Sequence, residues 1–521
     1  MNQGNPAPAR LLIAAALALS IGWGIRGNYG HETGAMIPGA LAAMAAVILS
    51  GRQEWISRIP YFAFFGALGW SFGGSISYMQ VIGYTHSGHS LSVLYGFACL
   101  YLIGFLWAAL GGAGTALPAC LSDRELKDFF TVTVTVFAAW IFQDLIVAFF
   151  IHTDPAFRQR DPLYWYDTDW LGVTAALVAV LLLALVRRKY DSPTSLVVHM
   201  TVGWWIGFLV LVVLFGWRMT PPRGDNWAGC LGMVIASFIF FERKTWRLVT
   251  ASSIIAGTIG GVGFALADLI KLLGIGTGWE TNWHSILEQS YGFINGIGIG
   301  AVILLLSKRI PVSPPESEKG FWRYFAIGFV LIGITYLNLR KNPGIWLNAK
   351  TVPPVLYGLS AEIWFNIGFA LCSLMLVLLL WRHKRDPLPI IPPNPLGKAQ
   401  LFFAIFLWWI VIGNFERALV SFAPQRLITE GVILLNSVIC STLVLLTTCS
   451  SGQSVVQTEP FHLKRTIALT FAVSILTPLF CWATIRTIYD DAQIGYASRH
   501  IRFGADTTAT KTKPAEDKPH P

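Results

Sequence analysis

Charged side chains inside long apolar segments are the residues of this sequence most suited to chemistry in a membrane. Asp144 follows Gln143 in one apolar segment, and Glu288 lies near the start of another. Asp268 and Lys271 lie three residues apart in a third segment, so they can pair on one face of a helix. An unpaired charge at the centre of a bilayer costs at least about 2.5–3.5 kcal/mol on insertion scales. We therefore expect Asp144 or Glu288 to line a water-filled cavity and to bind a proton or another coupling cation.

A glycine-rich stretch, 22–34, ends the first apolar segment and contains Arg26, His31 and Glu32. Helices that are short or broken by glycine expose backbone ends, and these ends can bind ions or substrates. The stretch 216–226 in the second half of the chain is also rich in helix breakers. We expect the two stretches to form a gate or an entry site. The alternative is a tight turn at the membrane surface, in which Arg26 reaches the lipid head groups.

Histidines offer a further kind of chemistry. His86 and His89 have a spacing that suits two metal ligands. Together with His31 and Glu32 they could form a zinc-like site, because imidazole and carboxylate groups both bind that ion. The alternative is that they are ordinary polar groups of loops at the membrane surface. The metal is left unassigned, and we expect no cofactor.

The elements that must hold these residues are membrane-spanning helices. Of the 521 residues, 54% are hydrophobic and 13% are charged, and the mean hydropathy is +0.57. Apolar runs of about 17–25 residues recur along the chain, and each is long enough to cross a hydrocarbon layer as a helix. Such continuous runs disfavour a transmembrane barrel, whose strands alternate. The net charge of +10 comes from Lys and Arg clusters between apolar runs, which indicates orientation in the bilayer and not a nucleic-acid partner.

The apolar runs predict an all-α polytopic membrane protein with about 15 transmembrane helices. We place the helices at 11–25, 33–50, 59–82, 91–110, 129–151, 170–186, 195–217, 226–241, 248–275, 286–307, 321–337, 361–381, 399–422, 431–449 and 466–489. Lys and Arg are about twice as frequent in one set of alternate connections as in the other. Because basic residues favour the cytoplasmic side, we expect a cell (inner) membrane protein with a cytoplasmic N-terminus and an extracytoplasmic C-terminus.

Short sequence matches recur along the chain at a nearly constant offset. Positions 22–23, Gly-Trp, recur at 216–217, and positions 95–97, Tyr-Gly-Phe, recur at 291–293. Because several short matches share one offset, they indicate a tandem duplication.

The duplication predicts two six-helix repeats, 1–193 and 194–388. Six predicted helices separate the matches, so both repeats have the same orientation in the bilayer. Two parallel six-helix repeats are the architecture of major-facilitator-type transporters, in which substrate lies between the halves near the midplane. The similarity is one of architecture only, because the loop 51–55 lacks the glycine-rich signature of acidic and basic residues expected of that superfamily. A three-helix segment follows at 389–490, and we expect the polar tail 491–521 to be disordered.

The repeat also suggests a partner for one buried acid. The position equivalent to Asp144 falls near 338–340. Arg340 is therefore a candidate partner for Asp144 across the pseudo-axis.

These features favour a secondary transporter of a small polar or charged solute, working by alternating access between the two halves. Its partners would be the lipid bilayer, the solute and a coupling cation or proton. The chain has no phosphate-binding loop, so ATP-driven transport by this chain alone is not expected. The alternative is a membrane-embedded transferase or hydrolase that acts on a lipid-linked substrate at the outer face. Its candidate residues are His31, Glu32, His86 and the acidic, aromatic loop 152–169.

Overall fold

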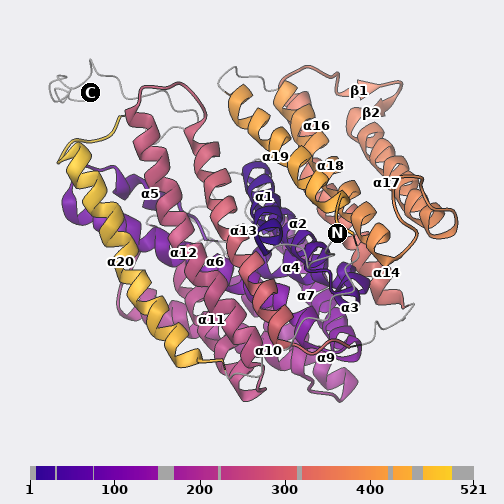
Figure 1. The fold of residues 1–521 in the computed structure, drawn as a ribbon, viewed down its shortest axis with the longest axis horizontal. Coiled ribbons are helices and arrows are strands. Elements are labelled where there is room, and N and C mark those ends of the chain that lie inside the picture. Colours follow the sequence, from indigo (N-terminus) through magenta and orange to yellow (C-terminus); the bar gives the residue numbers. More distant parts are fainter. Residues whose placement is uncertain are drawn as a thin grey trace, which may run out of the picture.

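The computed structural model describes a chain that is almost entirely helical (Figure 1). The described residues are 8–27, 29, 32–73, 76–150, 169–220, 225–313, 320–420, 426–448 and 461–495. Within them the β-structure is one short antiparallel pair, β1 (Val355–Leu356) and β2 (Leu359–Ser360). The prediction of an all-α polytopic membrane protein is confirmed.

Thirteen helices in the described part of the chain are long and apolar enough to cross a membrane. They are α1 (Pro8–Arg26), α2 (Glu32–Ser50), α6 (Ser90–Cys120), α7 (Asp123–Phe150), α9 (Asp169–Arg187), α10 with η2 (Ser192–Gly207 and Phe208–Leu214), α12 (Arg247–Gly276), α13 (Trp283–Arg309), α14 to α16 with η3 (Phe321–Gly328, Phe329–Ile334, Thr335–Leu339 and Lys341–Asn348), α17 (Ala361–Arg385), α18 (Pro395–Val420), α19 (Leu427–Leu445) and α20 (Leu463–Tyr489).

The two remaining predicted spans are shorter helices. The span expected at 59–82 is divided into α4 (Ile59–Gly73) and α5 (Met79–Thr85), and the span expected at 226–241 is α11 (Asn226–Arg243). A short helix, α3 (Gln53–Ser57), lies in the turn after α2. The break between α4 and α5 is the discontinuity that matters for the site described below.

The centre of the protein is formed by helices that are apolar on every side. In α2, 89% of the most apolar stretch is buried inside the protein, whereas the share is 6% in α17 and 11% in α7 and α9. A helix that is hydrophobic all round is a buried one. The poorly buried apolar helices form the perimeter, where the surrounding lipid covers them.

Small residues bring the central helices into close contact. α13 packs along α1, and α12 packs along α6. A Cβ atom added at Gly296 of α13 would overlap the Ala15 carbonyl of α1, and one added at Gly104 of α6 would overlap the Gly260 carbonyl of α12. Glycine and alanine at helix contacts let backbones approach closely in a membrane. The central contacts therefore join helices of the first predicted repeat to helices of the second.

Two contacts between the predicted repeats have corresponding partners. The Tyr291 ring lies 4.9 Å from the Trp23 ring, which joins α13 to the end of α1. Tyr95, the sequence equivalent of Tyr291, donates a hydrogen bond of 3.1 Å to the carbonyl of Arg218, which follows Trp217, the equivalent of Trp23. The two contacts differ in kind, and the duplication stays a prediction.

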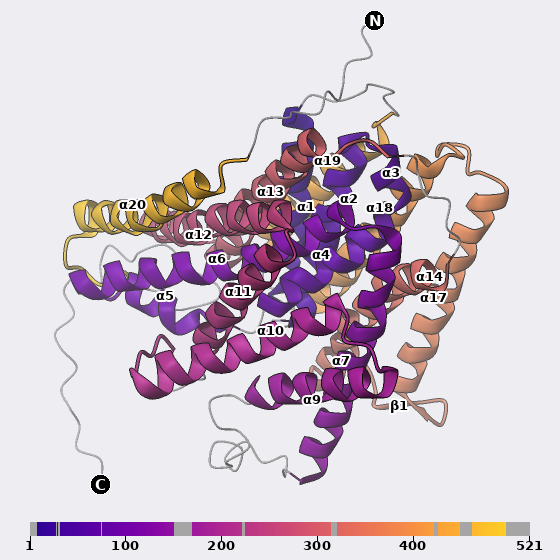
Figure 2. The same cartoon turned by 90° about the horizontal axis from the view of Figure 1, so that it is seen from below.

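The last three helices do not pack as one unit. α18 and α19 contact each other and lie against α2 and α1, whereas α20 lies against α12 and α6. Figures 1 and 2 show α20 on the opposite side of the protein from α18 and α19. These helices therefore cover the central bundle from two sides.

Candidate functional site

A buried ion pair joins the end of α1 to the beginning of α13. Nη1 of Arg26 lies 3.5 Å from Oε1 of Glu288, and the two side chains are 2% and 7% exposed. Arg26 is the last residue of α1, and Glu288 is in the second turn of α13. The C-terminal end of a helix favours a cation and the N-terminal end favours an anion. Because the effect is confined to the terminal turn, the end of α1 supports the charge of Arg26.

A tyrosine and a histidine complete the surroundings of the Glu288 carboxylate. The Tyr78 hydroxyl donates a hydrogen bond of 2.9 Å to Oε1 of Glu288. Nε2 of His284, one turn earlier in α13, lies 3.4 Å from the Tyr78 hydroxyl and 3.9 Å from the same carboxylate oxygen. Tyr78 belongs to the break between α4 and α5, immediately before α5 begins. The interruption of that span is what brings the hydroxyl to the ion pair.

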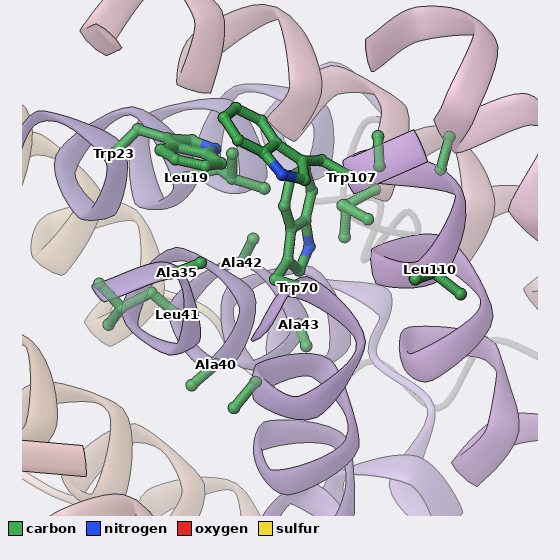
Figure 3. Close-up of a cluster of buried hydrophobic side chains, with 14 of the residues drawn as sticks. Leu19, Trp23, Ala35, Ala40, Leu41, Ala42, Ala43, Trp70, Trp107 and Leu110 are labelled. Carbon is green, nitrogen blue, oxygen red and sulfur yellow. The ribbon is translucent and has the colours of Figure 1, made fainter. Parts of the chain in front are cut away.

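Aromatic rings enclose the guanidinium of Arg26. Its Cζ atom lies 4.4 Å from the ring centre of Trp23, 5.1 Å from that of Trp107 and 5.9 Å from that of Tyr78. The Trp70 ring meets the Trp23 ring edge-on at 5.8 Å. Figure 3 shows Trp23, Trp70 and Trp107 gathered from α1, α4 and α6, and we call these three residues the tryptophan box. Contact between a cation and aromatic faces offsets part of the cost of removing Arg26 from water.

Glycines give the backbone room to reach the ion pair. A Cβ atom added at Gly27 would overlap Oε2 of Glu288, and one added at Gly24 would lie 2.7 Å from Cγ of Gln289. Gly24 and Gly27 thus let the end of α1 approach the second repeat closely.

A second buried pair lies on the neighbouring helix α12. Nζ of Lys271 is 3.6 Å from Oδ1 of Asp268, and both side chains are fully buried. The Thr85 hydroxyl, at the end of α5, donates a hydrogen bond of 2.6 Å to Oδ2 of Asp268. Asp268 lies one helical turn beyond Phe264, whose ring packs against Tyr78 at 5.1 Å. The local pairing expected from the spacing is present, and Thr85 is an additional partner.

The opposite end of α13 is also held by a charged residue of the first repeat. Nη1 of Arg52 donates hydrogen bonds of 3.0 and 2.8 Å to the carbonyls of Ser307 and Ile310, and Nη2 donates one of 3.0 Å to the carbonyl of Pro311. Arg52 also pairs with Glu54. At 1.5 Å per residue, Glu288 and Ile310 are roughly 33 Å apart along α13, about the thickness of the hydrocarbon layer. We call the Arg26–Glu288 contact the first tie and the Arg52 contact the second tie.

Several predicted site residues lie away from the first tie. Asp144 is exposed on α7, where its carboxylate accepts a hydrogen bond of 3.2 Å from the Gln143 amide. Arg340 is exposed between α15 and α16. In the described part of the chain no ion pair joins Asp144 to Arg340, and neither is brought to Glu288.

The predicted histidine site is only partly described. His31 and the loop residues 151–168 lie outside the described residues. Glu32 is exposed, His86 is buried, and Nδ1 of His89 accepts a 3.3 Å hydrogen bond from the Ser92 amide as the N-cap of α6. Within the described ranges, no group of three or more His, Cys, Asp or Glu side chains could hold a metal ion.

The turn between α1 and α2 is covered by polar contacts from later helices. The Tyr29 amide donates a hydrogen bond of 2.9 Å to the Arg26 carbonyl, and Lys341 donates one to the Tyr29 carbonyl. Burial raises the pKa of the Tyr29 hydroxyl well above its ordinary value. Cζ of Arg417 lies 5.8 Å from the Tyr29 ring centre. Tyr29, which follows the first tie in the chain, is therefore held by contacts from α16 and α18.

Sequence reasoning did not find the aromatic partners of Arg26. Trp23 stood out only as part of the repeated Gly-Trp pair, and Trp70 and Trp107 lie in apolar runs where tryptophan needs no special explanation. The Gly-Gly-Ser sequence at 73–75, shortly before Tyr78, is the feature of the sequence that could have indicated a break in the third span.

Comparison with known proteins adds one partial match. A protein of the fission yeast Schizosaccharomyces pombe, described as an uncharacterized oligopeptide transporter, is 34% identical over 76 residues. The match covers 15% of this chain and 9% of the yeast protein. Neither a protein-family model nor a solved structure matches the chain. With thirteen described helices able to cross a membrane, the chain is a multi-pass membrane protein.

Proposed function

We propose that the protein is a secondary transporter of a small polar or charged solute, working by alternating access between the halves 1–193 and 194–388. The proposal includes a cell (inner) membrane location with a cytoplasmic N-terminus. The single observation that supports it is the buried ion pair between Arg26 and Glu288. Arg26 belongs to α1 in the first half, and Glu288 belongs to α13 in the second half.

An ion pair at this position is poorly explained as scaffold. Removing two ions from water costs free energy, and their mutual attraction recovers little more than that cost. Apolar residues of similar size at the same positions often stabilise a fold more than the ion pair does. The rest of the contact between α1 and α13 includes small and apolar residues and one hydrogen bond, from the Ser20 hydroxyl to the Gln289 carbonyl, but no second ion pair in the described part of the chain. Polar groups retained inside a membrane protein usually mark a substrate or ion pathway. We therefore assign the pair to the transport site.

The two ties at opposite ends of α13 fit a pair of gates. Breaking the first tie would open the bundle on the side of the α1–α2 turn, and breaking the second would open it on the side of the α2–α3 turn. Both ties are formed here. In the proposed cycle, this conformation with both ties formed would be the occluded state.

The yeast match supports transport, since the matched protein is described as an oligopeptide transporter. Glu288 is the proposed coupling group for a proton or cation, because it lies at the contact between the halves and is buried. Asp144 remains a second candidate for that role, as the sequence suggested.

Cysteine labelling tests alternating access without knowledge of the solute. Ser20 of α1 is 2% exposed and donates a hydrogen bond of 2.9 Å to the Gln289 carbonyl of α13, so it lies in the contact between the halves. In a background without the native cysteines, Ser20→Cys should react with a membrane-impermeant thiol reagent added from either side of the membrane. Ser237→Cys is the matched control, because Ser237 is 1% exposed and bonds within its own helix α11; it should stay unreactive from both sides. Reaction of Ser20→Cys from one side alone, or from neither, would contradict transport by alternating access.

A further inference from the structure

The tryptophan box holds more hydrogen-bond donors than acceptors. Trp23, Trp70 and Trp107 are each 1% exposed, and no hydrogen-bond acceptor faces their indole N–H groups in the described part of the chain. The indole nitrogen is a donor only. A buried donor without an acceptor loses its hydrogen bond to water and gains nothing in return, so such groups are rare in folded proteins. Two of the three tryptophans, Trp23 and Trp107, lie against the guanidinium of Arg26, so their unpartnered donors need an explanation.

The ion pair adds further donors to the same place. The guanidinium of Arg26 carries five N–H groups, and Tyr78 contributes a hydroxyl. The carboxylate of Glu288 is the anionic acceptor that they share. Besides the Glu288 carboxylate, the site has no second anionic group that could accept hydrogen bonds from the remaining donors among the described residues.

We propose that the tryptophan box and Arg26 bind the carboxylate group of the transported solute. The carboxylate takes the place of Glu288 on the Arg26 guanidinium, where a planar fork of N–H groups matches two carboxylate oxygens. Its remaining lone pairs accept from the indole N–H groups of Trp23 and Trp107, the two tryptophans within 5.1 Å of the guanidinium centre. This inference names the substrate class for the proposed transport site and rests on that proposal for its role in transport.

Charge balance then requires a change at Glu288. A solute carboxylate and the Glu288 carboxylate together would leave a net negative charge around Arg26 in a buried site. The groups that face Glu288 are Arg26 from α1, Tyr78 from the break before α5 and His284 from its own helix. Uptake of one proton from water by Glu288 removes the excess charge, so we expect one proton to be bound with each carboxylate.

The test uses pairs of small compounds that differ in one functional group. The probes are sodium acetate, sodium lactate and dialanine, each compared with its own amide by titration calorimetry on the purified full-length protein. At least one acid should bind at least about tenfold more tightly than its amide, since a charged partner for Arg26 is lost in the amide. Titration in two buffers that differ in ionisation enthalpy should show about one proton taken up per acid bound.

Variants assign the binding to the box. Trp107→Phe keeps a ring but removes one N–H group, and it should weaken binding of the acid severalfold without changing that of the amide. Trp204→Phe is the control, because Trp204 is a buried tryptophan of α10 outside the box; it should bind the acid as the wild type does. Glu288→Gln should bind the acid without proton uptake.

Results that contradict the carboxylate assignment can be told apart from results that contradict the proposed transport function. Absence of binding by all three acids, or equal affinity for acid and amide, would overturn the carboxylate assignment. Equal effects of Trp107→Phe and Trp204→Phe would overturn the assignment to the box. Neither result bears on the labelling of Ser20→Cys, which tests alternating access independently.

Discussion

Glu288 of α13 lies 3.5 Å from Arg26 of α1, so one ion pair links the start of a second-half helix to the end of a first-half helix. Because Arg52 holds the carbonyls at the other end of α13, this helix is attached to the first half at both ends. Any motion that separates the halves on one side must therefore break one tie and can leave the other intact.

Removal of one charge from the first tie should destabilise the protein strongly. Glu288→Gln leaves the Arg26 guanidinium buried without a counter-charge, which costs about 3–5 kcal/mol. The double variant Arg26→Gln with Glu288→Gln should lose less than the sum of the two single variants, because neither buried charge remains. Denaturant unfolding in mixed micelles measures the free energy of unfolding of the single and double variants. Glu362→Gln, at an exposed position of α17, should stay within about 0.5 kcal/mol of wild type. Additive single effects would show that the two side chains do not interact.

Gly27 should tolerate no side chain. Its added Cβ would overlap Oε2 of Glu288 and lie 2.8 Å from Oε1. Gly27→Ala should therefore push the carboxylate from Arg26 and destabilise the protein by about 1–3 kcal/mol. Gly83→Ala in α5 has no heavy atom within 4 Å of the added Cβ and should be neutral or stabilising, since alanine favours helix. Equal unfolding free energies for the two variants would show that the Glu288 carboxylate does not lie against Gly27.

The hydroxyl of Thr85 should matter more than its methyl group. Thr85→Val removes the donor to Oδ2 of Asp268 and should cost about 1.5–3 kcal/mol, the range for a hydrogen bond to a charged group. Thr85→Ser keeps the hydroxyl and should retain most of the stability. Denaturant unfolding measures the free energy of unfolding of both variants. A larger decrease in Thr85→Ser than in Thr85→Val would contradict the prediction.

The parts of the fold that depend on local patterns could be predicted from the sequence. Continuous apolar runs specify helices that cross the membrane, because a backbone in lipid must satisfy its own hydrogen bonds. The pairing of Asp268 with Lys271 followed from helical spacing alone. Such features need only neighbours along the chain.

The composition of the site depends on distant contacts and was only partly predictable. Arg26 and Glu288 were both recognised as unusual, but their contact spans 262 positions and no local pattern encodes it. Asp144 was expected to line a cavity because its charge lies inside an apolar segment, yet it is exposed on the perimeter helix α7. Periodicity alone could not have distinguished the lipid-facing side of α7 from its packed side, since both are apolar.

The most direct test of the two-tie account combines gate variants with the Ser20→Cys reporter. Arg26→Gln breaks the first tie and should increase labelling from the side of the α1–α2 turn. Arg52→Gln breaks the second tie and should increase labelling from the side of the α2–α3 turn. Opposite shifts in sidedness, measured as the ratio of labelling rates from the two sides, are the predicted result. The same shift in both variants, or no shift in either, would contradict the claim that the ends of α13 act as alternating gates.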